Sequence, residues 1–222
     1  MHWLDKLERK YGRFHIEGLM LYITATMLCI YIMDNFLPLS INISDWIDLS
    51  RSQVLQGQVW RLVTFIFLPP ASSPVFVLFA LYFYYFIGTS LEEVWGSFQF
   101  NIYYLFGVIG TIIAGLITGY GDNTYLNLSL FLAFAQLFPE HQVLLFFFIP
   151  IKIKYLAYLD WILFAWSFIV GSWTIRAAIV ASLINFFLFF GPGMFRGLKN
   201  KFKYRSVQRN WRKQMKQNGG MR

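Results

Sequence analysis

The sequence predicts an all-α, polytopic membrane protein built as a bundle of six transmembrane helices. Of its 222 residues, 57% are hydrophobic and 14% are charged, with a mean hydropathy of +0.50, whereas a soluble domain usually carries about 25% charged residues. Its 25 Phe, 13 Tyr and 8 Trp are too many to hide inside one soluble core of this length. This composition excludes a soluble enzyme, a secreted disulfide scaffold and a disordered chain.

The predicted helices come from six apolar stretches of the chain. Spanning the hydrocarbon core takes about 20 helical residues. The fourth stretch is shorter than that, which predicts a helix surrounded by the other five rather than one that faces lipid along its length. The stretches cover residues 18–37, 74–95, 100–119, 124–138, 153–170 and 175–193.

This pattern divides the chain into an N-terminal arm (1–17), a membrane domain (18–193) and a basic tail (194–222). Within the domain, residues 38–73 form the longest connection between helices, and they are rich in Trp, Leu and Ile but poor in charge. A free aqueous loop of that composition would be unusual. We therefore expect an interfacial or re-entrant element on the outer side.

The positions of the basic residues predict the orientation of the bundle. All but three of the 19 lysines and arginines fall on the side of the N-terminus, the exceptions being Arg51, Arg61 and Arg176. Positive charge concentrates on the cytoplasmic side, so both termini are predicted to be cytoplasmic. The short N-terminal arm favours a bacterial plasma membrane, with an ER-type membrane as the alternative.

The tail carries lysines and arginines from Arg196 to Arg222 and no acidic residue. This charge predicts contact with anionic lipid of the bilayer or with a cytosolic partner. Nucleic acid is not the expected partner, because the interleaved Phe202, Tyr204 and Trp211 suit an interfacial helix better than a base-stacking surface.

Ionisable groups inside the membrane are costly and mark candidate sites. Asp160 lies seven residues into the fifth helix, where it is expected to pair with Tyr or Trp donors or to line a water-filled dent. Asp34 is expected to reach water, and Glu92 to be a hydrogen-bonded structural acid. With Cys29 as the only cysteine and three scattered histidines, no metal site and no cofactor are predicted.

Four polar residues on the fourth and sixth helices form a predicted cluster: Asn127 and Ser129 on one, Ser182 and Asn185 on the other. The two serines lie at a similar depth, roughly 8–10 Å from the outer ends. A serine nucleophile needs a neighbouring base, and the sixth helix contains no histidine. The cluster is therefore predicted to join the helices by hydrogen bonds worth about 0.6–2 kcal/mol each. Glycines of the third helix (107, 110, 115 and 119) predict close helix packing.

Three features follow one another along the chain. The outer loop contains Trp60-Arg61, the stretch 88–96, Gly-Thr-Ser-Leu-Glu-Glu-Val-Trp-Gly, closes the second helix, and the glycine-rich third helix follows. In this order they resemble the rhomboid superfamily, whose Trp-Arg motif is similar to Trp60-Arg61. The resemblance covers the six-helix core and implies that Trp60, Arg61, Gly88, Glu92 and Gly96 belong to the fold motif.

The resemblance also implies that the catalytic residues of this family are lost. Active rhomboid proteases carry Gly-x-Ser-Gly in the fourth helix and Ala-His-x-x-Gly-x-x-x-Gly in the sixth. Here Ser129 stands at the nucleophile position and Ser182 at the histidine position. Leu130, Asn185 and Phe189 replace small glycines, which implies more widely spaced fourth and sixth helices and a laterally open face.

The resemblance therefore implies an inactive pseudoprotease, similar to derlins, that binds transmembrane segments of client proteins in membrane-protein quality control or trafficking. An intramembrane serine protease with an unconventional base is the first alternative. A transporter or a scaffold is the next, although the sequence shows no inverted repeat of the kind many transporters contain.

Overall fold

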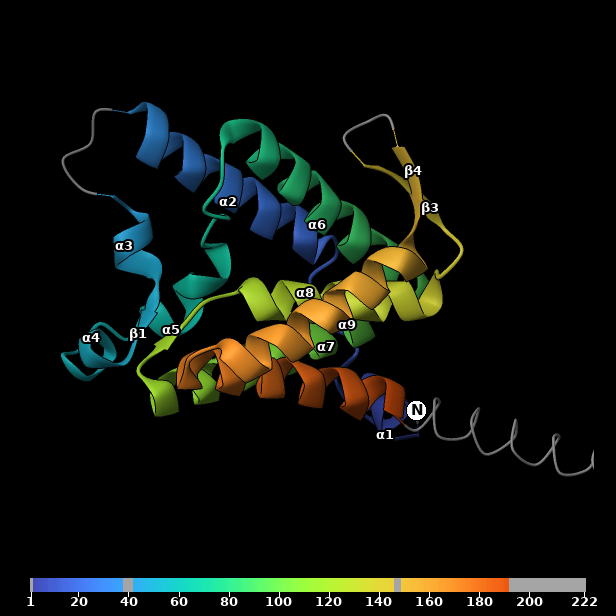
Figure 1. Ribbon diagram of the computed structural model, residues 1–222. Coiled ribbons are helices and arrows are strands. Elements are labelled where there is room, and N and C mark those ends of the chain that lie inside the picture. The colour runs from blue at the N-terminus through green and yellow to red at the C-terminus, as the bar shows by residue number, and fades with distance from the viewer. Residues whose placement is uncertain (1, 38–41, 146–148, 192–222) are drawn as a thin grey trace, which may run out of the picture. The chain divides into compact units, whose positions relative to one another are not determined.

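The computed structural model describes residues 2–37, 42–145 and 149–191. Within them, five helices are long and apolar enough to cross a membrane, and α8 (Thr124–Leu137) is a shorter apolar helix. The predicted all-α membrane bundle is confirmed, with each apolar stretch forming a helix (Figure 1). The long helices are α2 (Leu19–Phe36), α6 (Pro74–Trp95), α7 (Ser97–Thr118), α9 (Ile153–Val170) and the last helix, Trp173–Gly191.

The chain forms two compact units, Met1–Asn185 and Phe186–Arg222, whose boundary falls inside the last helix. The first unit contains every residue of the polar cluster and of the outer loop that is described below. In the second, the rings of Phe186 and Phe190 stack with their centroids 5.0 Å apart. The basic tail predicted for residues 194–222 lies outside the described residues.

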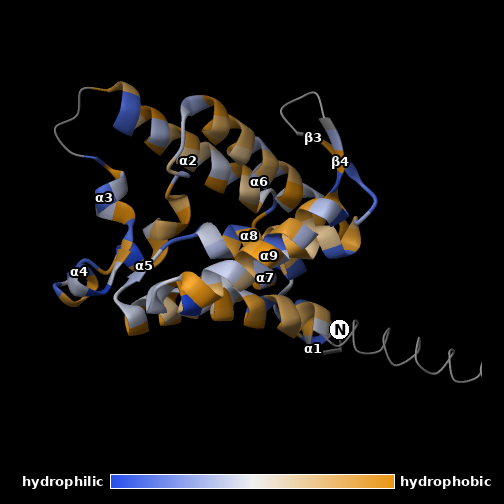
Figure 2. Ribbon diagram, in the orientation of Figure 1, coloured by the Kyte–Doolittle hydropathy of each residue, from blue (hydrophilic) through white to orange (hydrophobic). Residues whose placement is uncertain are grey.

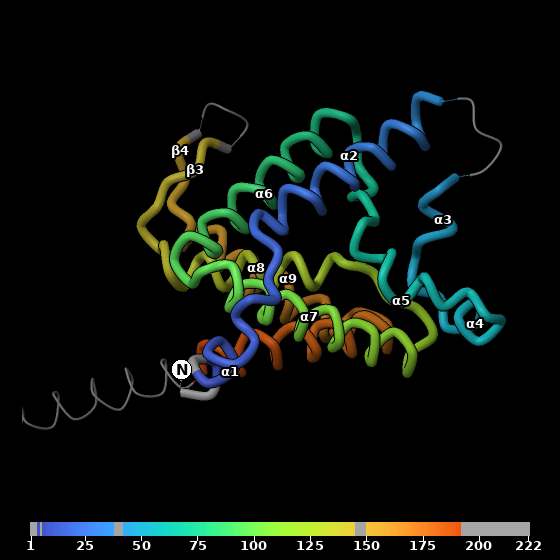
Figure 3. Tube along the Cα trace, turned by 180° about the vertical axis from the view of Figure 1, so that it is seen from behind, coloured from blue at the N-terminus to red at the C-terminus, as the bar shows by residue number. Residues whose placement is uncertain are grey.

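Helix α8 is the central element of the first unit. It packs against α6, α7 and α9, while α2 pairs with α6, as Figures 1 and 3 both show. This arrangement agrees with the prediction that the short fourth helix is surrounded by the others. Most of its side chains are buried: Leu126, Asn127, Ser129, Leu130, Phe131, Leu132, Ala133, Phe134 and Ala135.

The long helices are rich in hydrophobic residues, as the orange segments of their ribbons in Figure 2 show, and many of these side chains are exposed. On α9, for example, Ile162, Trp166 and Ile169 are each more than half exposed. Exposing apolar side chains of this kind to lipid does not destabilise a protein, whereas in water they would form a large apolar patch. The surface therefore fits a protein that is embedded in a bilayer.

Three features stabilise the junction of α2, α6 and α7. Gly18 has a φ of +65° and starts α2, and its N–H donates to Glu92 Oε1 over 2.9 Å. Gly88 on α6 faces α2 so closely that a Cβ there would lie 2.0 Å from Met20 Cγ. Gly96, with a φ of +81°, separates α6 from α7, so that α7 begins at Ser97, three residues earlier than predicted.

The N-terminal arm contains a helix that the charge pattern alone did not predict, α1 (His2–Tyr11). Its Leu4 is buried, and α1 lies against α7. Glu8 accepts a hydrogen bond of 2.9 Å from Gln99 Nε2. Asn101 Nδ2 of α7 also donates to the Ile16 carbonyl over 2.9 Å, so hydrogen bonds from two residues of α7 join the arm to the bundle.

The outer loop folds into short pieces. The antiparallel pairing of β1 with β2 (Tyr120–Gly121) sets Leu49 opposite Gly121, and Arg51 N donates to Gly119 O over 3.0 Å. These pairs fasten the loop to the end of α7. The pieces are α3 (Ser44–Ile47), β1 (Leu49–Ser50), α4 (Arg51–Leu55), α5 (Arg61–Thr64) and η1 (Phe65–Phe67).

A β-hairpin, which the sequence analysis did not predict, connects α8 to α9. Strand β3 (Gln142–Leu145) pairs antiparallel with β4 (Ile149–Lys152). At its base, Glu140 accepts hydrogen bonds from Lys152 Nζ at 2.7 Å and Lys154 Nζ at 2.6 Å. Within the residues that the structure describes, the membrane bundle is therefore all-α, and its connections contain two small two-stranded sheets.

Candidate functional site

The predicted cluster on α8 and the last helix is organised by Tyr103 of α7. The Tyr103 hydroxyl lies 2.7 Å from Ser129 Oγ and donates to the Ser129 carbonyl over 3.0 Å. Ser129 Oγ donates to the Ser182 carbonyl over 3.4 Å, and Asn185 Nδ2 donates to the Tyr103 carbonyl over 3.3 Å. The structure thus brings Ser129, Ser182 and Asn185 together through a tyrosine that sequence reasoning missed.

The sequence feature that could have predicted the role of Tyr103 is the glycine four residues later, Gly107. Gly107 lies on the same face of α7, and a Cβ there would lie 2.4 Å from Leu126 Cδ1 and 3.0 Å from Asn185 Nδ2. Such close approach is how small residues let transmembrane helices pack. The face of α7 that contains Gly107 therefore had to meet both neighbouring helices.

The wider spacing that the resemblance implied for α8 and the last helix is not found at this level. Ser129 Oγ reaches the Ser182 carbonyl directly, and both serines are buried. The expectation was wrong at Asn185 for a physical reason: this side chain fits over Gly107 of α7 rather than between α8 and the last helix.

Ser129 has a phenol, not a base, as its hydrogen-bonded side-chain partner. A neutral phenol can donate or accept a hydrogen bond but does not remove a proton from serine near pH 7. Among the described side chains, the two histidines lie elsewhere. His15 Nδ1 is 2.6 Å from the Gly12 carbonyl, and the His141 ring packs against Phe86 at 5.5 Å.

Several buried oxygens in this part of the bundle have no hydrogen-bond partner among the described residues. All belong to residues of the membrane-spanning helices or of α8. Asn127, which is 2% exposed, lies within hydrogen-bonding reach of the Tyr84 hydroxyl, yet its Oδ1 stays unpaired. The unpaired atoms are Tyr104 OH, Asn127 Oδ1, Asp160 Oδ2, Ser182 Oγ and Asn185 Oδ1.

Asp160 lies on α9 and is only 5% exposed. It shares a stripe of buried side chains with Ile153 and Phe164. The Phe164 ring packs 5.9 Å from the Tyr125 ring of α8. Helices α8 and α9 run in opposite directions (Figure 1). Asp160 lies one turn before Phe164 on α9, and Ser129 lies one turn after Tyr125 on α8, so Asp160 and Ser129 are at the same level. No hydrogen bond joins the two among the described residues, so the structure sets Asp160 beside the cluster rather than within it.

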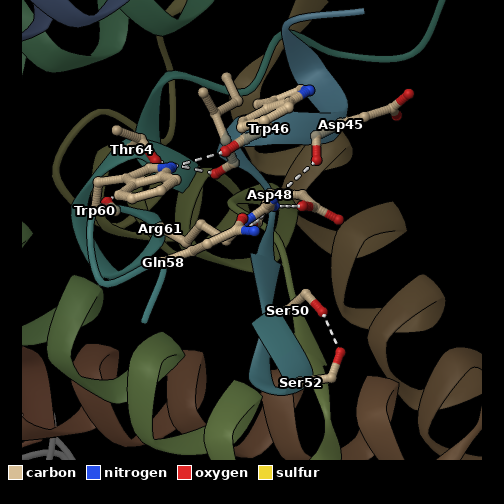
Figure 4. A network of polar contacts seen from close by, with 10 residues as sticks. Asp45, Trp46, Asp48, Ser50, Ser52, Gln58, Trp60, Arg61 and Thr64 are labelled. Carbon is tan, nitrogen blue, oxygen red and sulfur yellow. Dashed lines mark hydrogen bonds and ion pairs between the residues drawn. The ribbon is translucent and has the colours of Figure 1, made fainter. Parts of the chain in front are cut away.

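Arg61 organises the outer loop from inside it (Figure 4). Its side chain is 2% exposed, and it donates to the Asp48 carbonyl at 2.9 Å, the Asp45 carbonyl at 2.8 Å and Gln58 Oε1 at 2.8 Å. It also pairs with the Asp48 carboxylate. Burial raises the pKa of Asp48 above its usual value, and the Arg61 guanidinium opposes that rise. The neighbouring Trp60 Nε1 donates to the Trp46 carbonyl over 3.2 Å.

Asp34 fixes the start of the same loop, although it was expected to be a solvated acid. Its carboxylate accepts hydrogen bonds from the Ile43 N–H at 2.6 Å, the Ser44 N–H at 3.1 Å and Ser44 Oγ at 2.6 Å. A carboxylate that accepts N–H groups at a helix start satisfies donors that would otherwise lack a partner. The residues that the resemblance assigned to the fold motif lie in two places. The outer loop contains Trp60 and Arg61, and the α2–α6–α7 junction contains Gly88, Glu92 and Gly96.

One family matches most of the chain. Residues 19–191 match the family described as eukaryotic integral membrane protein, DUF1751. The chain belongs to this family. The match to DUF1751 runs from the first residue of α2 to the last residue of the last helix, so it includes the outer loop and the polar cluster. No curated protein matches the chain.

Membership of DUF1751 corrects the predicted location. The short N-terminal arm favoured a bacterial plasma membrane, but the family is eukaryotic, so that prediction was wrong. The length of the arm is not a guide to the organism; the structure shows only that residues 2–11 form a helix in contact with α7. The DUF1751 protein is an integral membrane protein of a eukaryotic family.

Proposed function

We propose that this protein is a non-catalytic, rhomboid-like membrane protein that binds transmembrane segments of client proteins, in membrane-protein quality control or trafficking. The observation that carries the proposal is the packing of α9. Of its side chains, Ile153, Asp160 and Phe164 are buried, and they face α8. The rest of this helix presents apolar side chains outward.

The face between α6 and α9 is the proposed binding surface. Both helices pack against α8, and neither packs extensively against the other. Tyr82 on α6 and Trp166 on α9 are each more than 60% exposed. Lipid is as apolar as a client helix, so association there depends on close packing and on polar contacts. The unpaired oxygens of Asn127 and Asp160 supply candidate polar contacts.

The polar cluster supports a non-catalytic role. Ser129, at the position of the rhomboid nucleophile, has its hydroxyl next to the Tyr103 phenol and the Ser182 carbonyl. Serine at position 182 offers no base. The hydroxyl groups and the Asn185 amide instead tie α7, α8 and the last helix together.

Two further contacts are part of the proposal. The bilayer surrounds the apolar helices, and the basic residues of the tail, 194–222, bind anionic headgroups or an acidic cytosolic partner. Nucleic acid is not a proposed partner, because aromatic residues alternate with the basic ones as in interfacial helices.

Photocrosslinking tests the binding surface. A benzophenone amino acid replaces Ile162 on α9, which is 64% exposed, or Ile113 on α7, which is 54% exposed, as a matched control. Each variant is reconstituted with a defined single-span segment. We expect crosslinks from position 162 well above those from position 113. Equal yields from the two positions, or none from position 162, would contradict the proposal.

A further inference from the structure

The helices of the bundle contain unpaired acceptors and very little positive charge. No lysine or arginine occurs between Arg61 and Lys152, so α6, α7 and α8 contain none. Of the unpaired buried atoms in the described membrane-spanning helices and α8, four belong to amide or carboxylate oxygens, which accept hydrogen bonds, and three belong to groups that can donate. The acceptors are Asn101 Oδ1, Asn127 Oδ1, Asp160 Oδ2 and Asn185 Oδ1, and the possible donors are Tyr104 OH, Ser182 Oγ and Arg176 Nε. The one guanidinium among these groups, that of Arg176, donates through Nη2 to the Ile169 carbonyl, nine residues along α9 from Asp160. None of the described cations forms an ion pair with the Asp160 carboxylate.

Asp160 is the one acid at mid-depth among the described membrane-spanning helices. Asp34, Glu92 and Glu93 lie near helix ends, where Asp34 and Glu92 accept backbone hydrogen bonds. Asp160 Oδ2 has no such partner. An ionised carboxylate taken from water into an apolar environment is strongly destabilised unless a partner pairs with it.

Asp160 is close to the lipid-facing edge of α9 even though it is itself buried. Its chain neighbours are exposed, Leu159 by 50% and Trp161 by 37%. Long basic side chains extend their stem along apolar surface and carry their charge several ångströms from the backbone. A basic residue of a helix lying against α9 could therefore reach the carboxylate without entering the bundle.

From this arrangement we infer that Asp160 selects client transmembrane segments that carry a lysine or arginine at its depth, forming an ion pair with that residue inside the membrane. The inference rests on the proposed client binding and names the chemistry of the client. Charge complementarity supports it, because Asp160 Oδ2 is unpaired and no described lysine or arginine forms an ion pair with this carboxylate. A polar contact between helices in lipid contributes about 1–2 kcal/mol, which corresponds to roughly a five- to thirty-fold preference.

The experiment measures binding of labelled single-span segments to the full-length protein in nanodiscs by energy transfer. The segments are identical leucine–alanine helices with Lys, Leu or Glu at the depth of Asp160. Wild type should bind the Lys segment roughly five- to thirty-fold more tightly than the Leu segment, and the Glu segment most weakly. Asp160→Asn should reduce the Lys preference to near one, whereas Glu93→Gln, which removes an exposed acid at the end of α6, should retain it.

A charge swap completes the design. Asp160→Lys should reverse the order, so that the Glu segment binds best. Should a variant fail to fold, the order of the three segments on the wild type still decides the question. Equal binding of the Lys and Leu segments would overturn the inference and leave client binding standing. Binding of none of the segments would overturn both.

Discussion

The side chain of Leu49 in the outer loop occupies the space beside Gly115 of α7. A Cβ on Gly115 would lie 2.6 Å from Leu49 Cδ2 and 3.2 Å from its Cγ, and Leu49 itself is fully buried. The glycine predicted to pack against a neighbouring helix therefore receives a loop residue. This contact and the β1–β2 pairing dock the loop onto the end of α7.

The Leu49–Gly115 contact predicts a non-additive pair of mutations. Gly115→Ala should destabilise the protein by about 1–3 kcal/mol through overpacking, and Leu49→Ala by about 2–5 kcal/mol through the cavity it leaves. The double variant should lose less than the sum, because truncating Leu49 removes the atoms that clash with the new methyl. Unfolding in mixed detergent micelles measures each free energy. Strict additivity would contradict the contact.

Arg61 is predicted to be required for the fold of the outer loop. Arg61→Ala removes charge-assisted hydrogen bonds to Asp48 and Asp45, which contribute roughly 1.5–3 kcal/mol each. Limited proteolysis of residues 42–73 in nanodiscs should then proceed at least tenfold faster. Arg61→Lys should be intermediate, because an ammonium keeps the charge but lacks the planar fork.

Arg51→Ala is the matched control for Arg61, since the Arg51 side chain is exposed and it is the backbone N–H of Arg51 that donates to Gly119 O. It should leave the cleavage rate unchanged. If Arg61→Ala were cleaved no faster than Arg51→Ala, the anchoring role of Arg61 would be wrong.

The β3–β4 hairpin should depend on pH through Glu140. Hydrogen bonds from Lys152 and Lys154 lower the pKa of its carboxyl from 4.5 to about 2. Because the pKa is lower in the folded state, the stabilisation is present above about pH 4.5 and is lost as the pH falls toward 2. The group is exposed, so salt should weaken the effect.

Hydrogen exchange of the hairpin amides, corrected for the intrinsic rate at each pH, tests this expectation. Glu140→Gln should exchange faster than wild type at pH 6 and low salt. The difference between the two proteins should shrink toward pH 2 and in high salt. A difference that is constant with pH would mean that the ion pairs do not stabilise the hairpin.

The helices could be predicted because their signal is local. Five of the apolar stretches are long enough to cross the membrane as helices, and the stretch that forms α8 is too short. That difference in length predicted that the other helices surround α8. Pairing between distant segments has no such signal. The strands around Leu49 and Gly121 are two residues long, too short to show an alternating pattern.

The polar cluster was predictable only in part. Counting turns from the helix ends put Ser129 and Ser182 at one depth, and the structure brings them together. Tyr103 was missed because one tyrosine among thirteen in an aromatic-rich membrane chain looks like an ordinary packing residue. The role of Asp34 was not predicted because its partners, the N–H groups of residues 43 and 44, belong to the outer loop. The amino-acid composition of a loop does not reveal the path of its backbone.

The hydroxyl of Ser129 is predicted to be a packing group without nucleophilic reactivity. Ser129→Ala should destabilise the protein by about 0.5–1.5 kcal/mol, a modest amount because Tyr103 keeps its bond to the Ser129 carbonyl. Tyr103→Phe should destabilise the protein by a similar amount. The double variant should lose less than the sum of the two, because each single variant already removes the same hydrogen bond between the Tyr103 and Ser129 hydroxyls. Client crosslinking from position 162 should be unchanged in Ser129→Ala.

Fluorophosphonate labelling in lipid tests the same residue chemically, with an active rhomboid protease and a cleavable transmembrane substrate as the positive control. Wild type should neither label nor cleave, because the Tyr103 phenol beside Ser129 Oγ cannot take up its proton at neutral pH. Labelling that disappears in Ser129→Ala, together with cleavage of the substrate, would show that a base acts on this serine. The proposal of a non-catalytic protein would then be replaced by that of an intramembrane hydrolase.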